Sequence, residues 1–126
     1  MISGRTALYA VIGHPVAHSL SPAMQNAALA AAGVDGVYVA LPVPPDRLEE
    51  ALAGAHALGL RGLNVTVPHK PRAATACRRL DPTAEVCGAA NTLRRVDDGW
   101  EGFNTDAPAT LGLLQAAGLA RGDRAL

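Results

Sequence analysis

This sequence of 126 residues has few aromatic side chains, no formal net charge and no long apolar run. One tryptophan, two tyrosines and one phenylalanine leave few rings on which nucleic-acid bases could stack, and eleven basic residues balance eleven acidic ones. No apolar run is long enough to cross a bilayer, and the first residues lack the apolar core and cleavage site of a signal peptide. These absences argue against a nucleic-acid or membrane partner, and we expect a cytoplasmic protein.

Cysteine is equally scarce. Cys77 and Cys87 form no C-x-x-C pair, and a disulfide between them is not expected in the cytoplasm. His14 and His18 have the spacing of a helical metal pair, but Pro15 lies between them in a segment typical of a loop. We therefore predict two free thiols and no metal site.

Apolar residues are abundant: they make up 49% of the chain, against 17% for charged residues, which suits one domain with its own core. Short runs typical of buried strands alternate with segments that have the 3.6-residue period of amphipathic helices. Ser21 is expected to cap the first helix, because Pro22 follows it. The pattern predicts strands at 7–13, 36–43 and 62–68, and helices at about 22–32, 45–58, 71–79 and 82–86.

The pattern changes after residue 88. Residues 90–96 and 100–104 flank Asp-Asp-Gly, a hairpin signal, and a last helix is expected from near Thr105 toward Gly118. This order predicts an α/β fold, a three-layer sandwich with a mostly parallel sheet, one antiparallel element and helices on both faces. We expect residues 1–120 to form this domain and residues 121–126 to begin another.

The stretch "NVTVPHK", residues 64–70, places polar side chains at the end of a strand that should be apolar. Residues two apart face the same side of a strand, so Asn64 and Thr66 should project together, away from the valines that follow each of them. Lys70 comes just after the carboxyl end of the strand, the edge where open α/β sheets bind ligands. Pro71 favours an extended Lys70 at the entry of the next helix. A lone exposed lysine needs no function, but three polar groups at one strand end favour a site.

Two further segments could serve a ligand. Ser19 and Ser21 precede a helix whose free amide groups favour an anion such as a carboxylate, although a cap alone explains Ser21 equally simply. Asn91 begins a strand after Gly88, where a buried amide could reach a ligand hydroxyl or make an Asx-type turn.

The segment "GFNTD", residues 102–106, supplies a carboxylate. Asn104 would cap the last helix, and Asp106 in its first turn suits the helix dipole without any function. Beside Lys70, however, Asp106 would form a pair that exchanges a proton with a ligand oxygen in a cleft that excludes water.

Four motifs together resemble the substrate-binding domain of the shikimate dehydrogenase family over about residues 9–114. They stand in the family's order: "GHPVAHSLSPAMQNAA" (13–28), "GLNVTVPHK" (62–70), "GAANTL" (88–93) and "GFNTD" (102–106). The resemblance implies NADPH-dependent reduction of 3-dehydroshikimate to shikimate, on the route to aromatic amino acids and chorismate. It also implies roles for the following residues: Lys70 and Asp106 as the catalytic pair, Ser19 and Ser21 on the substrate carboxylate, and Asn64, Thr66, Asn91 and Asp106 on its hydroxyls.

The sequence departs from the family's usual pattern at several points. Gln25 and Ala90 replace a common His and Val outside the expected chemistry, whereas Pro71 bears on the Lys70 rotamer and Ala109, in place of Gly, on a domain junction. The family continues into a nicotinamide-binding domain, but no G-x-G-x-x-G follows a strand here. NADP would therefore be bound mainly by a part of the enzyme that this chain lacks. A shikimate- or quinate-binding module without redox activity, and a quinate-preferring dehydrogenase, remain the alternatives.

Overall fold

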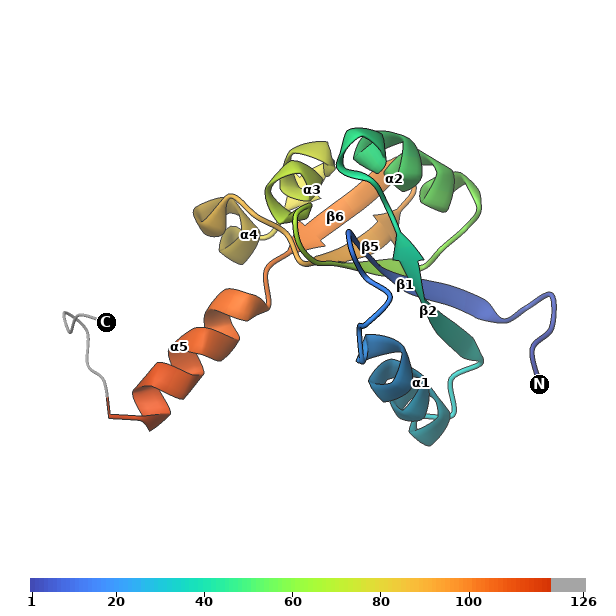
Figure 1. Ribbon diagram of the computed structural model, residues 1–126, viewed down its shortest axis with the longest axis horizontal. Coiled ribbons are helices and arrows are strands. Elements are labelled where there is room, and N and C mark those ends of the chain that lie inside the picture. Colours follow the sequence, from blue (N-terminus) through green and yellow to red (C-terminus); the bar gives the residue numbers. More distant parts are fainter. Residues whose placement is uncertain (119–126) are drawn as a thin grey trace.

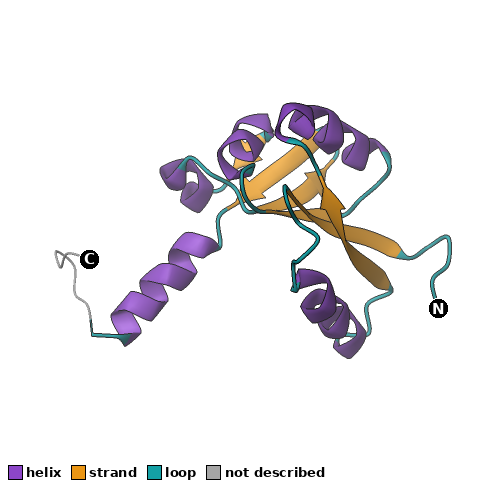
Figure 2. Cartoon of the chain, in the orientation of Figure 1, coloured by secondary structure: helices purple, strands orange, loops and turns teal. Residues whose placement is uncertain are grey.

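In the part of the chain that the structure describes, six strands form one sheet with helices on both of its faces. The computed structural model describes residues 1–118 (Figures 1 and 2). Along the chain, the elements are β1 (Ala7–Gly13), α1 (Ser21–Ala31), β2 (Gly36–Pro42), the 3-10 turn η1 (Pro45–Arg47), α2 (Leu48–Ala57), β3 (Gly62–Val65), α3 (Lys70–Ala76), β4 (Arg79–Leu80), α4 (Pro82–Cys87), β5 (Thr92–Val96), β6 (Gly99–Phe103) and α5 (Asp106–Ala116).

The strand order is β2-β1-β3-β5-β6-β4. β1 pairs in parallel with β2 and β3, and β4 pairs in parallel with β6. β5 alone runs against its neighbours, pairing antiparallel with both β3 and β6. The predicted α/β fold with a mostly parallel sheet and one antiparallel element is therefore confirmed.

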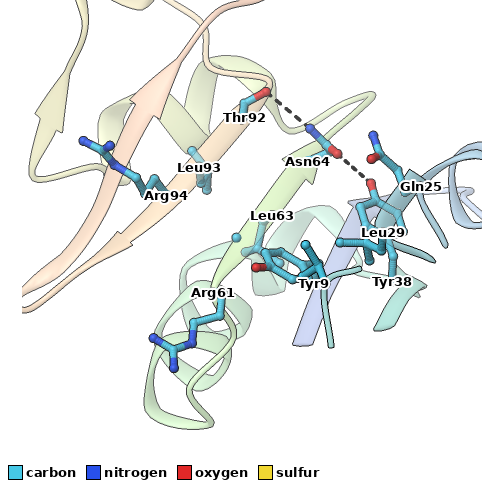
Figure 3. A pocket seen from close by; sticks show the side chains of 12 residues that line it. Tyr9, Gln25, Leu29, Tyr38, Arg61, Leu63, Asn64, Thr92, Leu93 and Arg94 are labelled. Carbon is cyan, nitrogen blue, oxygen red and sulfur yellow. Dashed lines mark hydrogen bonds between the residues drawn. The ribbon is translucent and has the colours of Figure 1, made fainter. Parts of the chain in front are cut away.

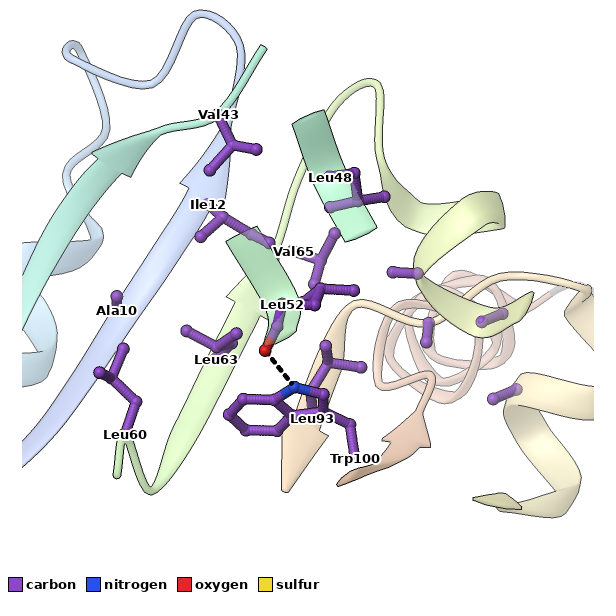
Figure 4. Packing of buried hydrophobic residues seen from close by; sticks show 14 residues of the cluster. Ala10, Ile12, Val43, Leu48, Leu52, Leu60, Leu63, Val65, Leu93 and Trp100 are labelled. Atoms are coloured by element: carbon purple, nitrogen blue, oxygen red, sulfur yellow. Dashed lines mark hydrogen bonds between the residues drawn. The ribbon is translucent and has the colours of Figure 1, made fainter. Parts of the chain in front are cut away.

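The two faces of the sheet carry different side chains because successive residues of a strand alternate. α2, α3 and α4 cover one face, and α1 lies against the other (Figure 1). Under α2, Ile12, Leu63 and Leu93 of the strands meet Leu48 and Leu52, as Figure 4 shows. The indole Nε1 of Trp100 donates to the Leu52 carbonyl at 3.0 Å, so the one polar atom of this buried ring is paired.

Three local expectations are wrong, each because the chain turns earlier or later than its pattern suggests. Ser21 is the first residue of α1 and Leu20 occupies the cap position, so Ser21 does not cap the helix. β3 ends at Val65, and Val67 is exposed in the turn that follows instead of alternating into the core. Lys70 is the first residue of α3 and not extended, although it does begin the helix as predicted. The two-residue strand β4 was not predicted at all.

Other boundaries agree with the sequence. Gly33 and Gly59 follow α1 and α2 with φ of +66° and +81°, the conformation for which glycine was expected at these helix ends.

Cys77 and Cys87 are free thiols. Within residues 1–118, no helix has both the length and the apolarity to cross a membrane. The predicted start of another domain at 121–126 lies outside the described residues.

The first test concerns the core under α2. Leu48 is fully buried, so Leu48→Ala should lower the free energy of unfolding by about 2–5 kcal/mol through lost burial and a residual cavity. Leu58, which follows the same helix and is 78% exposed, supplies the control, because Leu58→Ala should change stability by about 0.5 kcal/mol or less. Urea unfolding followed by Trp100 fluorescence measures both, and equal losses would contradict the described packing.

Candidate active site

The sheet topology brings four separate segments to one end of the sheet, where the parallel strands have their carboxyl ends. We call this end the sheet edge. The parallel strands β1 and β3 both end there, and antiparallel β5 begins there because Asn64 pairs with Thr92. β6 ends at the same edge, since Phe103 also pairs with Thr92. The residues that follow β3, precede β5 and follow β6 are therefore neighbours in space, although up to about forty positions separate them in the sequence.

Lys70 and Asp106 meet at this edge. The Lys70 ammonium donates to Asp106 Oδ2 at 2.6 Å, and the two side chains are 32% and 51% exposed. Each residue begins a helix, Lys70 in α3 and Asp106 in α5, so backbone structure fixes both ends of the pair. An ion pair this open to solvent contributes little to stability. Its accessibility leaves the lysine protons within reach of a ligand.

Asn91 holds the carboxylate in place. Its Nδ2 donates to Asp106 Oδ1 and to Thr105 Oγ1, each at 2.9 Å, while its Oδ1 accepts from the Thr105 amide at 2.9 Å and from the Thr92 hydroxyl at 3.2 Å. The side chain is thus satisfied at every donor and acceptor position. With one oxygen bound to Asn91 and the other to Lys70, Asp106 has a fixed orientation.

Asn104 was predicted to cap α5, but Thr105 occupies the cap position, and Asn104 lies one residue earlier and bonds the first amides of the helix with its side chain. Its Oδ1 accepts from the amides of Asp106 and Ala107, both at 3.0 Å, and its Nδ2 donates to the Ala89 carbonyl at 3.0 Å. The residue is only 6% exposed. The first turn of α5 is therefore tied to the segment that leads into β5.

Asn64 extends the polar network under the sheet edge. Its Oδ1 accepts from the Tyr38 hydroxyl at 2.7 Å, and its Nδ2 lies 3.3 Å from Thr92 Oγ1 and 3.4 Å from the Asn91 carbonyl. Figure 3 shows the Tyr38–Asn64–Thr92 part of this series. We call the connected residues Tyr38, Asn64, Thr92, Asn91 and Asp106 the relay.

The serine pair lies at the start of α1. Ser19 Oγ accepts from the Ser21 amide at 3.2 Å, so Ser19 serves one of the free amides of the helix. The Ser21 hydroxyl lies beside the Tyr38 phenol. Ser21 is therefore a neighbour of the relay residue Tyr38, and both serines are partly buried.

Thr66 is held by its backbone between two elements. Its amide donates to the Ile12 carbonyl at 3.0 Å, and its own carbonyl accepts from the His69 amide at 3.0 Å. A Cβ at Gly13 would lie 2.4 Å from the Thr66 methyl group, so the close approach of β1 requires glycine there. His69 fixes the same turn, because its buried ring bonds to the Val43 carbonyl at 2.7 Å.

A cavity of about 460 Å³ adjoins the relay on the α1 side of the sheet. Asn64, Thr92 and Tyr38 line one end, with Gln25 close by, and Tyr9 and Leu29 contribute the apolar part (Figure 3). Lys70 and Asp106 do not line it, and Asn91 connects the lining residue Thr92 to Asp106. Within residues 1–118, no group of three His, Cys, Asp or Glu side chains could hold a metal ion.

The structure thus links Lys70, Asp106, Asn91 and Asn64 by successive hydrogen bonds. Ser21 lies beside Tyr38, and Ser19 bonds the Ser21 amide. Tyr38 and Thr105 are the residues that sequence reasoning missed. Thr105 lies inside a motif already singled out, so its hydroxyl was a visible signal. Tyr38 sits in a run of apolar strand residues, where nothing marks a tyrosine as polar.

An open α/β sheet with amides, hydroxyls, a lysine and an aspartate gathered at one edge is the arrangement typical of domains that bind small polar molecules. The sequence profile of the family described as shikimate dehydrogenase substrate binding domain matches residues 11–93. The chain belongs to this family.

Individual proteins that the chain resembles are shikimate dehydrogenases as well. The shikimate dehydrogenase (NADP(+)) of Anaeromyxobacter sp. (strain K) is 74% identical over the whole chain, which spans 45% of that protein. The shikimate dehydrogenase structure from Aquifex aeolicus has 41% identity and a TM-score of 0.87 over 92% of this chain and 44% of its own. The shikimate 5-dehydrogenase of Thermus thermophilus in complex with NADP(H) and shikimate has 42% identity and a TM-score of 0.82 over 91% of this chain and 44% of its own. The chain therefore spans less than half the length of these relatives.

The buried phenol gives a pH prediction. Burial raises the pKa of Tyr38 to about 12 from the ordinary value of 10.0, and the neighbouring Ser21 hydroxyl acts in the opposite direction. Because the chain has two tyrosines, Tyr9→Phe leaves Tyr38 as the only phenol, and its tyrosinate absorbance should appear near pH 12. Ionisation near pH 10 in the folded variant would contradict the described environment.

The same shift sets the sign of an effect on stability. The folded state retains the Tyr38 proton above the pH at which the unfolded chain loses it, so the free energy of unfolding is at its full value below pH 10 and falls toward pH 12. Tyr38→Phe should remove this part of the alkaline loss in urea unfolding measured across that range.

Proposed function

We propose that this chain is the substrate-binding and catalytic part of an NADP-dependent shikimate dehydrogenase, which reduces 3-dehydroshikimate to shikimate. The observation that carries the proposal is the Lys70–Asp106 pair at 2.6 Å, with Asp106 held by Asn91 at the sheet edge. Membership of the family and the names of the relatives support the reaction. We assign residues 1–120 to this domain, and two free thiols suit the cytoplasm as its compartment.

The pair explains how a carbonyl would become a hydroxyl. When a hydride adds to the carbonyl carbon, negative charge develops on the oxygen, and Lys70 donates a proton to it. Lys70 is left neutral and regains its proton from solvent, to which its side chain is partly exposed. Asp106 keeps the ammonium aimed at the oxygen and accepts from the adjacent ring hydroxyl.

The remaining side chains would hold the ring. Ser19 and Ser21 donate to the substrate carboxylate near the amides of α1, where negative charge is favoured. Asn64 and Thr66 bond ring hydroxyls, which would otherwise lose their hydration unpaired. Asn91 reaches a hydroxyl by exchanging its bond to Thr105 for one to the ligand, while its bond to Asp106 remains.

The nicotinamide supplies the hydride. The described residues fit the substrate side of this reaction, whereas no Gly-rich turn between a strand and a helix is present to cradle its phosphates. NADP binding belongs, in this proposal, mainly to the part of the relatives that this chain does not cover. The chain alone should bind shikimate weakly, in about the millimolar range, and should not oxidise it.

The reaction is tested in a chimera in which this chain replaces the matching segment of the Anaeromyxobacter protein. Lys70→Ala should lower its kcat by about a hundredfold or more with a smaller effect on KM, because the proton donor acts in the transition state. Arg72→Ala is the matched control, since Arg72 lies on the same helix and bonds Glu49 away from the site. A chimera that prefers quinate, or that binds shikimate without turnover, would overturn the proposed reaction in favour of a quinate dehydrogenase or a binding module.

The serines are tested in the chain itself. Ser19→Ala combined with Ser21→Ala should remove hydrogen bonds worth roughly 1.5–3 kcal/mol each to a charged ligand group, and shikimate binding should become undetectable in an NMR titration. Ser3 is the one other serine in the chain, so Ser3→Ala is the control and should bind like the parent. Unchanged affinity in the double variant would show that the two hydroxyls bond only the protein backbone and not shikimate.

A further inference from the structure

Tyr38 occupies an unusual place in the network. It is 5% exposed and lies in β2, an outermost strand of the sheet. The outer backbone groups of β2 have no strand partner within residues 1–118. The Asn26 amide of α1 takes that role: its Oδ1 accepts from the Tyr38 amide at 2.9 Å and its Nδ2 donates to the Tyr38 carbonyl at 2.8 Å. Asn26 Nδ2 also donates to the Pro22 carbonyl at 2.8 Å, so α1 fixes the backbone of Tyr38 from outside the sheet.

The other end of Tyr38 determines how Asn64 is oriented. The phenol donates to Asn64 Oδ1 at 2.7 Å, an ordinary length for an O–H···O bond, whereas the two contacts of Asn64 Nδ2 are long for N–H···O bonds, at 3.3 and 3.4 Å. The oxygen of this amide is therefore firmly bound and its nitrogen is weakly bound. Nδ2 is the atom that a ligand oxygen can recruit at little cost.

The phenol is also suited to remain a donor. Its burial keeps it neutral through the pH range in which dehydrogenases work, so Asn64 Oδ1 always has a donor opposite it. A flipped amide would turn Oδ1 toward the Asn91 carbonyl and leave the phenol facing an NH₂ group.

We propose that Tyr38 is a positioning residue of the substrate site, which fixes the Asn64 amide so that its NH₂ group faces the substrate and selects for an oxygen acceptor there. The proposal rests on the function proposed above. Asn26 positions Tyr38, Tyr38 positions Asn64, and Asn64 contacts the ligand. Tyr38 does not touch Lys70 or Asp106, so its effect should fall on substrate binding and not on the chemical step.

Kinetics of the chimera test this role. Tyr38→Phe keeps the ring and removes the hydroxyl, and it should raise the KM for shikimate by about tenfold with kcat changed less than about twofold. Tyr9→Phe is the control, because Tyr9 lines the same cavity but belongs to none of the contacts of the relay. Circular dichroism and urea unfolding below pH 10 verify that both variants are folded.

A double-mutant cycle separates positioning from a structural effect. If Tyr38 acts through Asn64, Tyr38→Phe should have almost no further effect on KM in an Asn64→Ala background. An equal increase of KM in both backgrounds, or a loss confined to kcat, would overturn the proposal.

A measurement without substrate separates this proposal from the reaction. In ¹⁵N–¹H spectra of the chain, the Asn64 side-chain NH₂ signals, identified by their disappearance in Asn64→Ala, should shift or broaden in Tyr38→Phe and stay in place in Tyr9→Phe. Unchanged Asn64 signals in Tyr38→Phe would overturn the positioning role even if the chimera is active. If the chimera does not turn over shikimate but these signals respond, the proposed reaction fails and the control of Asn64 by Tyr38 stands.

Discussion

The site depends on the hydrogen bonds that Asn91 makes with its backbone and its side chain. The residue is nearly buried, and a buried amide without partners is costly, so each of its hydrogen-bonding groups must find one. Its backbone amide bonds the Phe103 carbonyl at the end of β6, and its backbone carbonyl accepts from the Val65 amide at the end of β3. Its side chain then reaches the first turn of α5. One residue thus joins two strand ends and a helix start, and the position of Asp106 follows.

The sequence predicted the elements well where a period of 2 or 3.6 was clear. The continuous apolar run at residues 7–13 was predicted as a buried strand, and in the structure Ile12 faces α2 while Val11 packs with Tyr38 on the other face. The sequence also predicted polar side chains at the carboxyl end of the third strand, because open α/β sheets bind ligands there, and this argument placed Lys70 with Asn64. Asp106 was added as a hypothetical partner of Lys70, and the place of Asn91 beside them came from the resemblance to the family.

What the sequence could not supply depends on contacts between distant segments. Tyr38 reads as one more apolar strand residue, because its partners lie 12 and 26 positions away. Ser21 satisfies the local rules for a cap, yet the chain enters α1 through a helical Leu20, and Ser19 bonds the first amide instead. β4 has only two residues, and its pairing with β6 follows from where α3 and α4 place it, not from a pattern of its own.

α5 leads away from the sheet, and none of its residues is buried (Figure 1). Asn91 and Asn104 hold its first turn, which we call the pivot, and the rest of the helix extends away from the sheet. Eleven residues span about 16 Å, and a tilt of about 10° at the pivot would carry the far end about 3 Å. Asp106 sits at the pivot, where the same tilt moves it least. A tilt of α5 about its first turn would therefore leave the Asp106 carboxylate almost in place.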